Sequence, residues 1–146
     1  MLRINNIIIH VIIPMIIGGL LYILYRDNSL LMFYWFRSLG IENFIILMRE
    51  NVLLVNKIPN WVIFNLPNGI WIYSLTSLML IIWYKDINKL KYIWLAIGPI
   101  IGISAEIGQF IHILPGTFDT TDLILCFFAG IAPFIIFKPQ MKRRIQ

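Results

Sequence analysis

The side chains best suited to chemistry lie in one stretch near the C-terminus, SAEIGQFIHILPGTFDTTD. Glu106, Gln109 and His112 follow one another at steps of three residues, so on a helix they would share one broad face. A Pro-Gly turn then leads to a second acidic pair, Asp119 and Asp122. Because a carboxylate inside an apolar helix is costly to bury, this pattern indicates a functional site.

Two interpretations are open for the aspartate pair. In the first, Asp119 or a neighbouring threonine is the N-cap of a helix, and Asp122 complements the positive end of the helix dipole. In the second, both converge with Glu106 on an outward-facing pocket for Mg²⁺, Ca²⁺ or the cationic group of a ligand. The sequence has a single cysteine, Cys126, and no HxxxH, DxD, P-loop or serine-nucleophile motif, so we expect no metal and no cofactor.

Glu106 needs a partner if it lies in a membrane. A cation could reach it from the segment between the first two spans, by inward folding of Arg37, Arg49 or Lys57. Otherwise the acid would sit protonated and bonded to an amide of Gln109, Asn65 or Asn68. A simple polar clasp between helices could use Asn or Gln, so a full carboxylate favours a binding role. We predict a ligand-binding pocket made of Glu106, Gln109, Asp119, Asp122, Asn65 and Asn68.

The composition is that of a membrane protein. Hydrophobic residues make up 60% of the 146, charged residues make up 13%, and the mean hydropathy is +0.83. Soluble domains are roughly half apolar and about a quarter charged. We predict one all-α polytopic membrane domain over residues 1–146, with about four transmembrane helices at 7–25, 61–84, 92–114 and 123–137. The formal charge of +5 fits membrane orientation, and we expect no nucleic-acid partner.

The segment between the first two spans, at about 30–57, is predicted to lie on the extracytoplasmic membrane surface. Its first part, LLMFYWF, is aromatic and too short to cross a bilayer. Beyond Gly40, polar residues recur seven apart from Glu42 to Lys57, opposite apolar ones, which predicts an amphipathic helix. This helix either senses lipid or covers the bundle as an ordinary surface helix.

The distribution of Lys and Arg predicts the orientation. With four spans, the N-terminus, the loop between the second and third spans and the C-terminus share one face. That face carries eight basic residues: Arg3, Lys85, Lys89, Lys91, Lys138, Lys142, Arg143 and Arg144. The opposite face carries four: Arg26, Arg37, Arg49 and Lys57. The positive-inside rule then places both termini of this multi-pass membrane protein in the cytoplasm.

Three features inside the spans carry structural predictions. The run NLPNG from Asn65 predicts a break or kink at membrane depth, or a break at the outer surface with spanning helix only from Ile70. Gly18 and Gly19 indicate close approach of a neighbouring helix. His10 is expected to be a packed or interfacial residue rather than a proton carrier.

Residues 106–130 contain a compound motif. Its parts are ExxQF from Glu106, Pro115-Gly116, FDxxDL from Phe118, and Gly130. This motif resembles the C-terminal signature of the VanZ-like family of small bacterial membrane proteins. The family pattern also has an arginine after the Pro-Gly and an asparagine one turn after the second aspartate, where this chain has no arginine and has Cys126. The resemblance implies site roles for Glu106, Gln109, Asp119 and Asp122.

Three functions follow as hypotheses. The resemblance implies an envelope protein linked to tolerance of glycopeptide or cationic amphiphilic agents, whose acidic pocket engages a membrane lipid or a lipid-linked or cationic amphiphilic ligand. One alternative is a small intramembrane enzyme acting on a lipid or isoprenoid headgroup, with Glu106 as general acid or base and the aspartates holding a divalent ion. Another is a non-catalytic helper subunit of a transporter or envelope complex, with a membrane-protein partner.

Overall fold

A computed structural model describes residues 2–52, 58–83 and 85–142, and within these ranges the chain forms helices and no strand. The elements in chain order are α1 (Leu2–Ile7), the π-helical turn η1 (Ile8–Ile12), α2 (Ile13–Tyr25), α3 (Leu31–Ser38), α4 (Glu42–Glu50), α5 (Asn60–Phe64), α6 (Leu66–Trp83), α7 (Lys91–Phe110) and α8 (Thr120–Lys142). The all-helical fold class is thereby confirmed.

Four helical segments are long and apolar enough to cross a membrane, as the sequence predicts. They are Ile4–Tyr25, Leu66–Trp83, Lys91–Phe110 and Thr120–Phe137. The first joins α1, η1 and α2 into one continuous run. The second and third are shorter than the predicted spans, because α6 begins at Leu66 and α7 ends at Phe110. This set is compatible with a multi-pass membrane protein.

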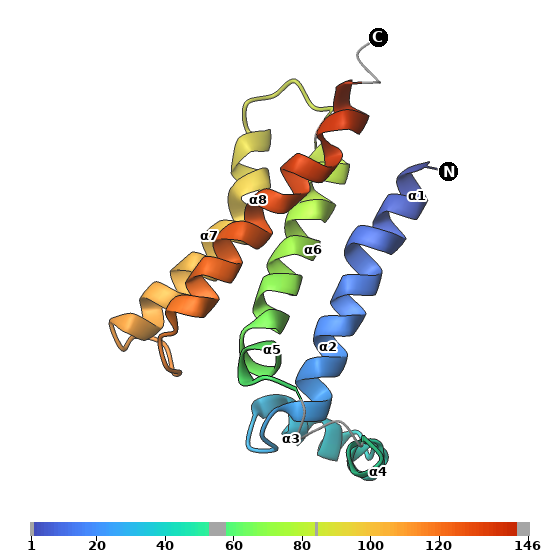
Figure 1. Ribbon diagram of the computed structural model, residues 1–146, viewed down its shortest axis with the longest axis vertical. Helices are drawn as coiled ribbons and strands as arrows, with labels where there is room; N and C mark the ends of the chain where they lie inside the picture. The colour runs from blue at the N-terminus through green and yellow to red at the C-terminus, as the bar shows by residue number, and fades with distance from the viewer. Residues whose placement is uncertain (1, 53–57, 84, 143–146) are drawn as a thin grey trace.

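The long helices form a bundle with α6 at its centre, packed against α8, α7 and α2 (Figure 1). One end of the bundle carries both termini and the loop 85–90 (Figure 1). We call it the basic end, after the lysines of that loop. The opposite end carries α3, α4, α5 and the turn between α7 and α8, and we call it the acidic end. The predicted grouping of the termini with the second loop is therefore present in the fold.

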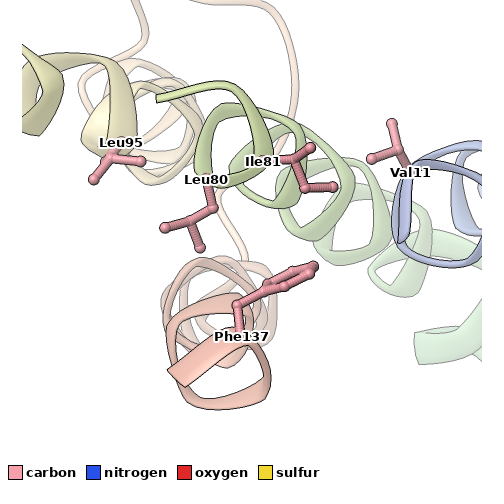
Figure 2. Close-up of a cluster of buried hydrophobic side chains, with 5 residues drawn as sticks. All are labelled: Val11, Leu80, Ile81, Leu95 and Phe137. Carbon is pink, nitrogen blue, oxygen red and sulfur yellow. The ribbon is translucent and has the colours of Figure 1, made fainter. Parts of the chain in front are cut away.

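Apolar side chains from four elements hold the basic end together. Val11, Leu80, Ile81, Leu95 and Phe137 are buried in one cluster, contributed by η1, α6, α7 and α8 (Figure 2). Lipid tails are as apolar as these side chains, so within a bilayer the cluster is stabilised by close packing rather than by exclusion of water.

The first helix is irregular because of Pro14. A proline has no N–H, and its ring collides with the carbonyl four residues earlier, here that of His10. The π-turn over Ile8–Ile12 widens the helix just before the proline. His10 shares a 2.6 Å hydrogen bond with the Tyr73 hydroxyl and lies edge-on to the Phe137 ring. This confirms the prediction of a packed histidine.

Small residues set the closest helix contacts. A β-carbon at Gly18 would lie 2.7 Å from Nε1 of Trp71, so α2 and α6 could not approach as closely with any other residue there. A β-carbon at Gly98 would lie 2.6 Å from Oγ1 of Thr76, which brings α7 against α6. Gly19 has no neighbour within 4 Å of its β-position, so the predicted close approach holds for Gly18 alone of that pair.

The segment after the first span forms two short helices, not one. α3 and α4 are bent by 119° at Gly40, whose φ of 71° ends α3 in a left-handed cap. Trp35 and Phe44 are exposed on them, as suits a segment at a membrane surface. Lys57 lies outside the described residues, so the end of the predicted amphipathic stripe is not seen.

Candidate functional site

Side chains from three parts of the chain meet at the acidic end. Glu106 projects from α7, Asp119 and Asp122 lie at the start of α8, and Asn65 lies between α5 and α6. The Nδ2 of Asn65 donates to Oδ2 of Asp119 at 2.6 Å, and the backbone N–H of Asp119 donates to Oε2 of Glu106 at 3.3 Å. We call Glu106, Asp119, Asp122, Asn65 and Asn68 the acidic cluster.

Asp119 is the N-cap of α8. Its Oδ1 accepts the backbone N–H of Thr121 at 2.8 Å, while its carbonyl accepts the N–H of Leu123 at 3.2 Å. The Thr121 N–H, together with the Asn65 amide, holds the pKa of the Asp119 carboxyl below its usual value. A lowered pKa means that ionised Asp119 stabilises the fold above the ordinary carboxyl pKa, and that this contribution is lost as the pH falls through the lowered value.

The structure fits the capping interpretation of the aspartate pair. Asp122 sits in the first turn of α8, where the helix dipole favours negative charge. Asp122 also interacts electrostatically with Asp119 and with Glu106. The carboxylates that start α8 therefore lie near Glu106, and their convergence on an outward-facing pocket stays a prediction.

Asn65 reaches Asp119 because the helix breaks at Asn65 itself. α5 ends at Phe64 and α6 starts at Leu66, so the predicted break lies before Pro67 and not within the Pro-Asn-Gly run. Pro67 occupies the first turn of α6, where no intrahelical N–H donor is needed. The spanning helix thus starts at Leu66, four residues earlier than the surface-break alternative placed it. Asn65 is only 4% exposed.

Two of the carboxylates are deeply buried. Glu106 is 3% exposed and Asp122 is 8% exposed, whereas Asp119 is half-buried. The amides of Asn68 and Asn65 approach the Asp122 carboxylate, yet its Oδ1 has no hydrogen-bond partner. A buried acceptor without a donor is destabilising by about 1–3 kcal/mol, so the cluster is not arranged for stability alone.

Among the described residues, Arg26 is a cation with a weak electrostatic interaction with the cluster, and the sequence reasoning did not name it as a partner. Arg26 caps the end of α2, interacts electrostatically with Asp122, and its guanidinium carbon lies 5.1 Å from the Tyr22 ring centre and 5.2 Å from that of Phe64. The signal available was its position at the end of the first span, beside the aromatic residue Tyr25.

The cations predicted to fold inward are engaged elsewhere or not described. Arg37 forms a surface ion pair with Glu42 at 2.7 Å. Arg49 binds the carbonyls of Ile23 and Arg26 and so ties α4 to the end of α2. Lys57 is outside the described residues. The inward-folding alternative therefore does not apply to Arg37 or Arg49, whose contacts lie elsewhere.

The helix α7 ends earlier than predicted, which changes the role of His112. Its last turn closes with the N–H of Ile113 bonded to the Gly108 carbonyl at 2.9 Å and that of His112 bonded to the Gln109 carbonyl at 3.1 Å. His112 adopts φ 59°, a left-handed conformation that histidine tolerates better than most residues. It is exposed beyond the helix, so it does not share the face of Glu106 as predicted.

Glu106 consequently lies close to the end of its helix. It is four residues from Phe110, or roughly 6 Å along the axis from the end of α7. The Gln109 side chain packs against Gly116 in the turn. A β-carbon at Gly116 would lie 2.9 Å from the Nε2 of Gln109. Its place in the ligand pocket stays a prediction.

The donor set does not suit a metal ion. Among the described residues, no group of three or more His, Cys, Asp or Glu side chains is placed to hold one. Cys126, one turn after Asp122, is buried at the Gly102 contact, where a β-carbon on that glycine would lie 3.0 Å from its Sγ. The arrangement can accept hydrogen bonds from a cationic group, with carboxylate oxygens and amides as partners.

Comparison with known proteins leaves the family open. No family model matches the chain, and no curated protein or solved structure matches it. The VanZ-like resemblance therefore stays a prediction that rests on the motif in residues 106–130.

Proposed function

We propose that the chain is a multi-pass membrane protein whose acidic cluster binds the cationic group of a membrane-embedded ligand. The observation that supports the proposal is the burial of two carboxylates, Glu106 and Asp122, at the start of α8, with the Asp119 N–H bonded to Glu106 and Oδ1 of Asp122 left without a hydrogen-bond partner. A ligand ammonium group would supply that donor and balance the excess negative charge.

The proposal places the acidic cluster on the outer face of a bacterial inner membrane. The basic end, with Lys85, Lys89 and Lys91 in its loop, would lie in the cytoplasm together with both termini. The bent pair α3–α4, with Trp35 and Phe44 exposed, would then lie in the outer headgroup region beside the cluster. A cationic amphiphile that inserts from outside would meet the cluster at this level.

The VanZ-like resemblance supports the same site. The motif residues Glu106, Asp119 and Asp122 lie near one another at the start of α8, and Arg26 is a nearby positive charge where the family's loop arginine is missing from this chain. The proposed role is tolerance of glycopeptide or cationic amphiphilic agents. The alternative of a metal-dependent lipid enzyme gains no support, because the described carboxylates do not form a metal-binding group.

Equilibrium binding tests the proposal. The protein in phosphatidylcholine nanodiscs should retain dodecylamine above the level of empty nanodiscs and should not retain dodecyl sulfate. Glu106→Gln and Asp119→Asn should each weaken dodecylamine retention by roughly tenfold, since each removes a charged acceptor. Glu50→Gln is the matched control, because Glu50 is exposed on α4 outside the cluster, and it should bind as the wild type does. Equal retention of amine and sulfate would contradict the proposal.

A further inference from the structure

A turn with three lysines joins α6 to α7 at the basic end, and a stacked pair of indole rings adjoins it (Figure 1). Trp83 is the last residue of α6 and Trp94 lies in the first turn of α7, and their ring centres are 5.6 Å apart with an interplanar angle of 4°. Because tryptophan is enriched at the headgroup level of membranes, this pair indicates where the bundle leaves the hydrocarbon region. Residues 85–91, which we call the lysine turn, then lie at the level of the lipid phosphates.

The backbone of the lysine turn is held in place by its own side chains. Oδ1 of Asp86 accepts the N–H of Asn88 at 2.9 Å, and Oδ1 of Asn88 accepts the N–H of Leu90 at 3.0 Å. Nζ of Lys91 donates to the carbonyl of Asp86 at 2.8 Å and closes the turn. The other two lysines are therefore presented from a preorganised backbone, which lowers the entropy lost when they bind a partner.

The lysine turn presents positive charge and apolar surface side by side. Lys85 and Lys89 are exposed, and between them Ile87 is 97% exposed. An isoleucine in that position is costly in water and is stabilised at the boundary between headgroups and acyl chains. Asp86 is the one acid among these residues, so the turn as a whole is positively charged.

We infer that the lysine turn binds the headgroups of anionic phospholipids, such as phosphatidylglycerol, in the leaflet that the basic end faces. Charge complementarity commits the surface to this partner. The predicted topology gives this side of the membrane eight of the twelve Lys and Arg residues and one of the seven acids, so anionic headgroups are attracted here and repelled at the acidic end.

The apolar surface commits the turn to a lipid rather than to free phosphate. Ile87 and the indole of Trp94, which is 41% exposed, have nothing to gain from a small hydrated anion, whereas a phospholipid offers acyl chain and phosphate together. This inference goes beyond the proposed function and does not depend on the acidic cluster, which lies at the opposite end of the bundle (Figure 1).

Native mass spectrometry of the full chain in detergent micelles tests the assignment. It measures the apparent dissociation constants of dioleoyl phosphatidylglycerol and dioleoyl phosphatidylcholine, which share their acyl chains and differ in headgroup charge. The double variant Lys85→Gln/Lys89→Gln neutralises the two exposed ammonium groups. The charge-matched control is Arg37→Gln/Lys57→Gln, in the segment of the sequence between the first two spans.

We expect the wild type to bind phosphatidylglycerol about fivefold more tightly than phosphatidylcholine, and the lysine variant to lose most of that preference while its phosphatidylcholine affinity stays unchanged. The control should bind both lipids as the wild type does. Equal affinities of the wild type for the two lipids, or an equal loss in the lysine variant and the control, would overturn the inference. A lysine variant that keeps the wild-type preference, or that loses both lipids alike, would also contradict recognition of headgroup charge by this turn.

Discussion

At the basic end of the bundle the helices meet mainly through apolar side chains, and at the acidic end they meet through carboxylates and amides. The basic end buries Val11, Leu80 and Phe137 in one apolar cluster (Figure 2), beside the hydrogen bond between His10 and Tyr73. The acidic end buries Glu106 and Asp122 and leaves an oxygen of Asp122 without a donor. A single central helix, α6, contributes to both ends.

The difference separates stability from function within one small fold. Close packing is the main force between helices in a bilayer, and the basic end has it. A polar contact between helices contributes only about 0.6 kcal/mol on average, so buried carboxylates are a poor way to hold an end together. The acidic end nevertheless buries Glu106 and Asp122, and the proposed binding role would account for them.

The largest expected effect is at the basic end. Leu80→Ala removes a side chain that is 3% exposed and leaves a cavity among four elements, so we expect a loss of about 3 kcal/mol in the free energy of unfolding. Denaturation by SDS in mixed micelles measures it. Ile135→Ala, at an exposed site on α8, is the control and should change stability little. A Leu80→Ala loss no larger than that of the control would show that this cluster does not hold the bundle.

The next effect is at the contact between α6 and α7. Gly98→Ala would place a β-carbon 2.6 Å from Oγ1 of Thr76 and 3.3 Å from the Ile72 carbonyl, and we expect overpacking to remove about 2 kcal/mol. Gly19→Ala makes the same change where no atom lies within 4 Å, so it should be neutral or stabilising. Equal stabilities of the two variants would mean that the helices do not approach as closely as described.

The smallest effect on stability is expected at the acidic end. Asp122→Asn keeps the side-chain shape and removes a buried charge that has an unpartnered oxygen, so unfolding should change by less than about 1 kcal/mol in either direction. The same variant should lose dodecylamine retention. A loss of stability as large as that of Leu80→Ala would make Asp122 a structural residue and erase the contrast between the ends.

Much of this fold is readable from the sequence. Hydropathy predicts four spans, and the grouping of both termini with the second loop follows from their number. The helix ends are less readable, because the apolar run after Phe110 continues without a break while His112 takes the left-handed position that sequence patterns assign to glycine. Pro67 put the predicted helix break in the wrong place, because a proline can occupy the first turn of a helix as well as interrupt one.

The members of the site were easier to name than its counter-charge. Buried acids inside an apolar run stand out, and the structure places Glu106, Asp119 and Asp122 near Asn65 and Asn68, while their role in binding stays a prediction. Arg26 was missed because proximity between the end of the first span and the start of the last depends on how α2 packs against α6.

The binding role of the acidic cluster is tested most directly by the direction in which dodecylamine affinity changes when the charge of Arg26 is removed. Arg26→Gln removes the neighbouring cation without touching an acid, so dodecylamine affinity in nanodiscs should rise by about fivefold while Glu106→Gln lowers it. If the two substitutions acted only by disturbing the packing, both would weaken dodecylamine binding. Affinities that fall together, or that stay at the wild-type value in both variants, would contradict a cation-binding site.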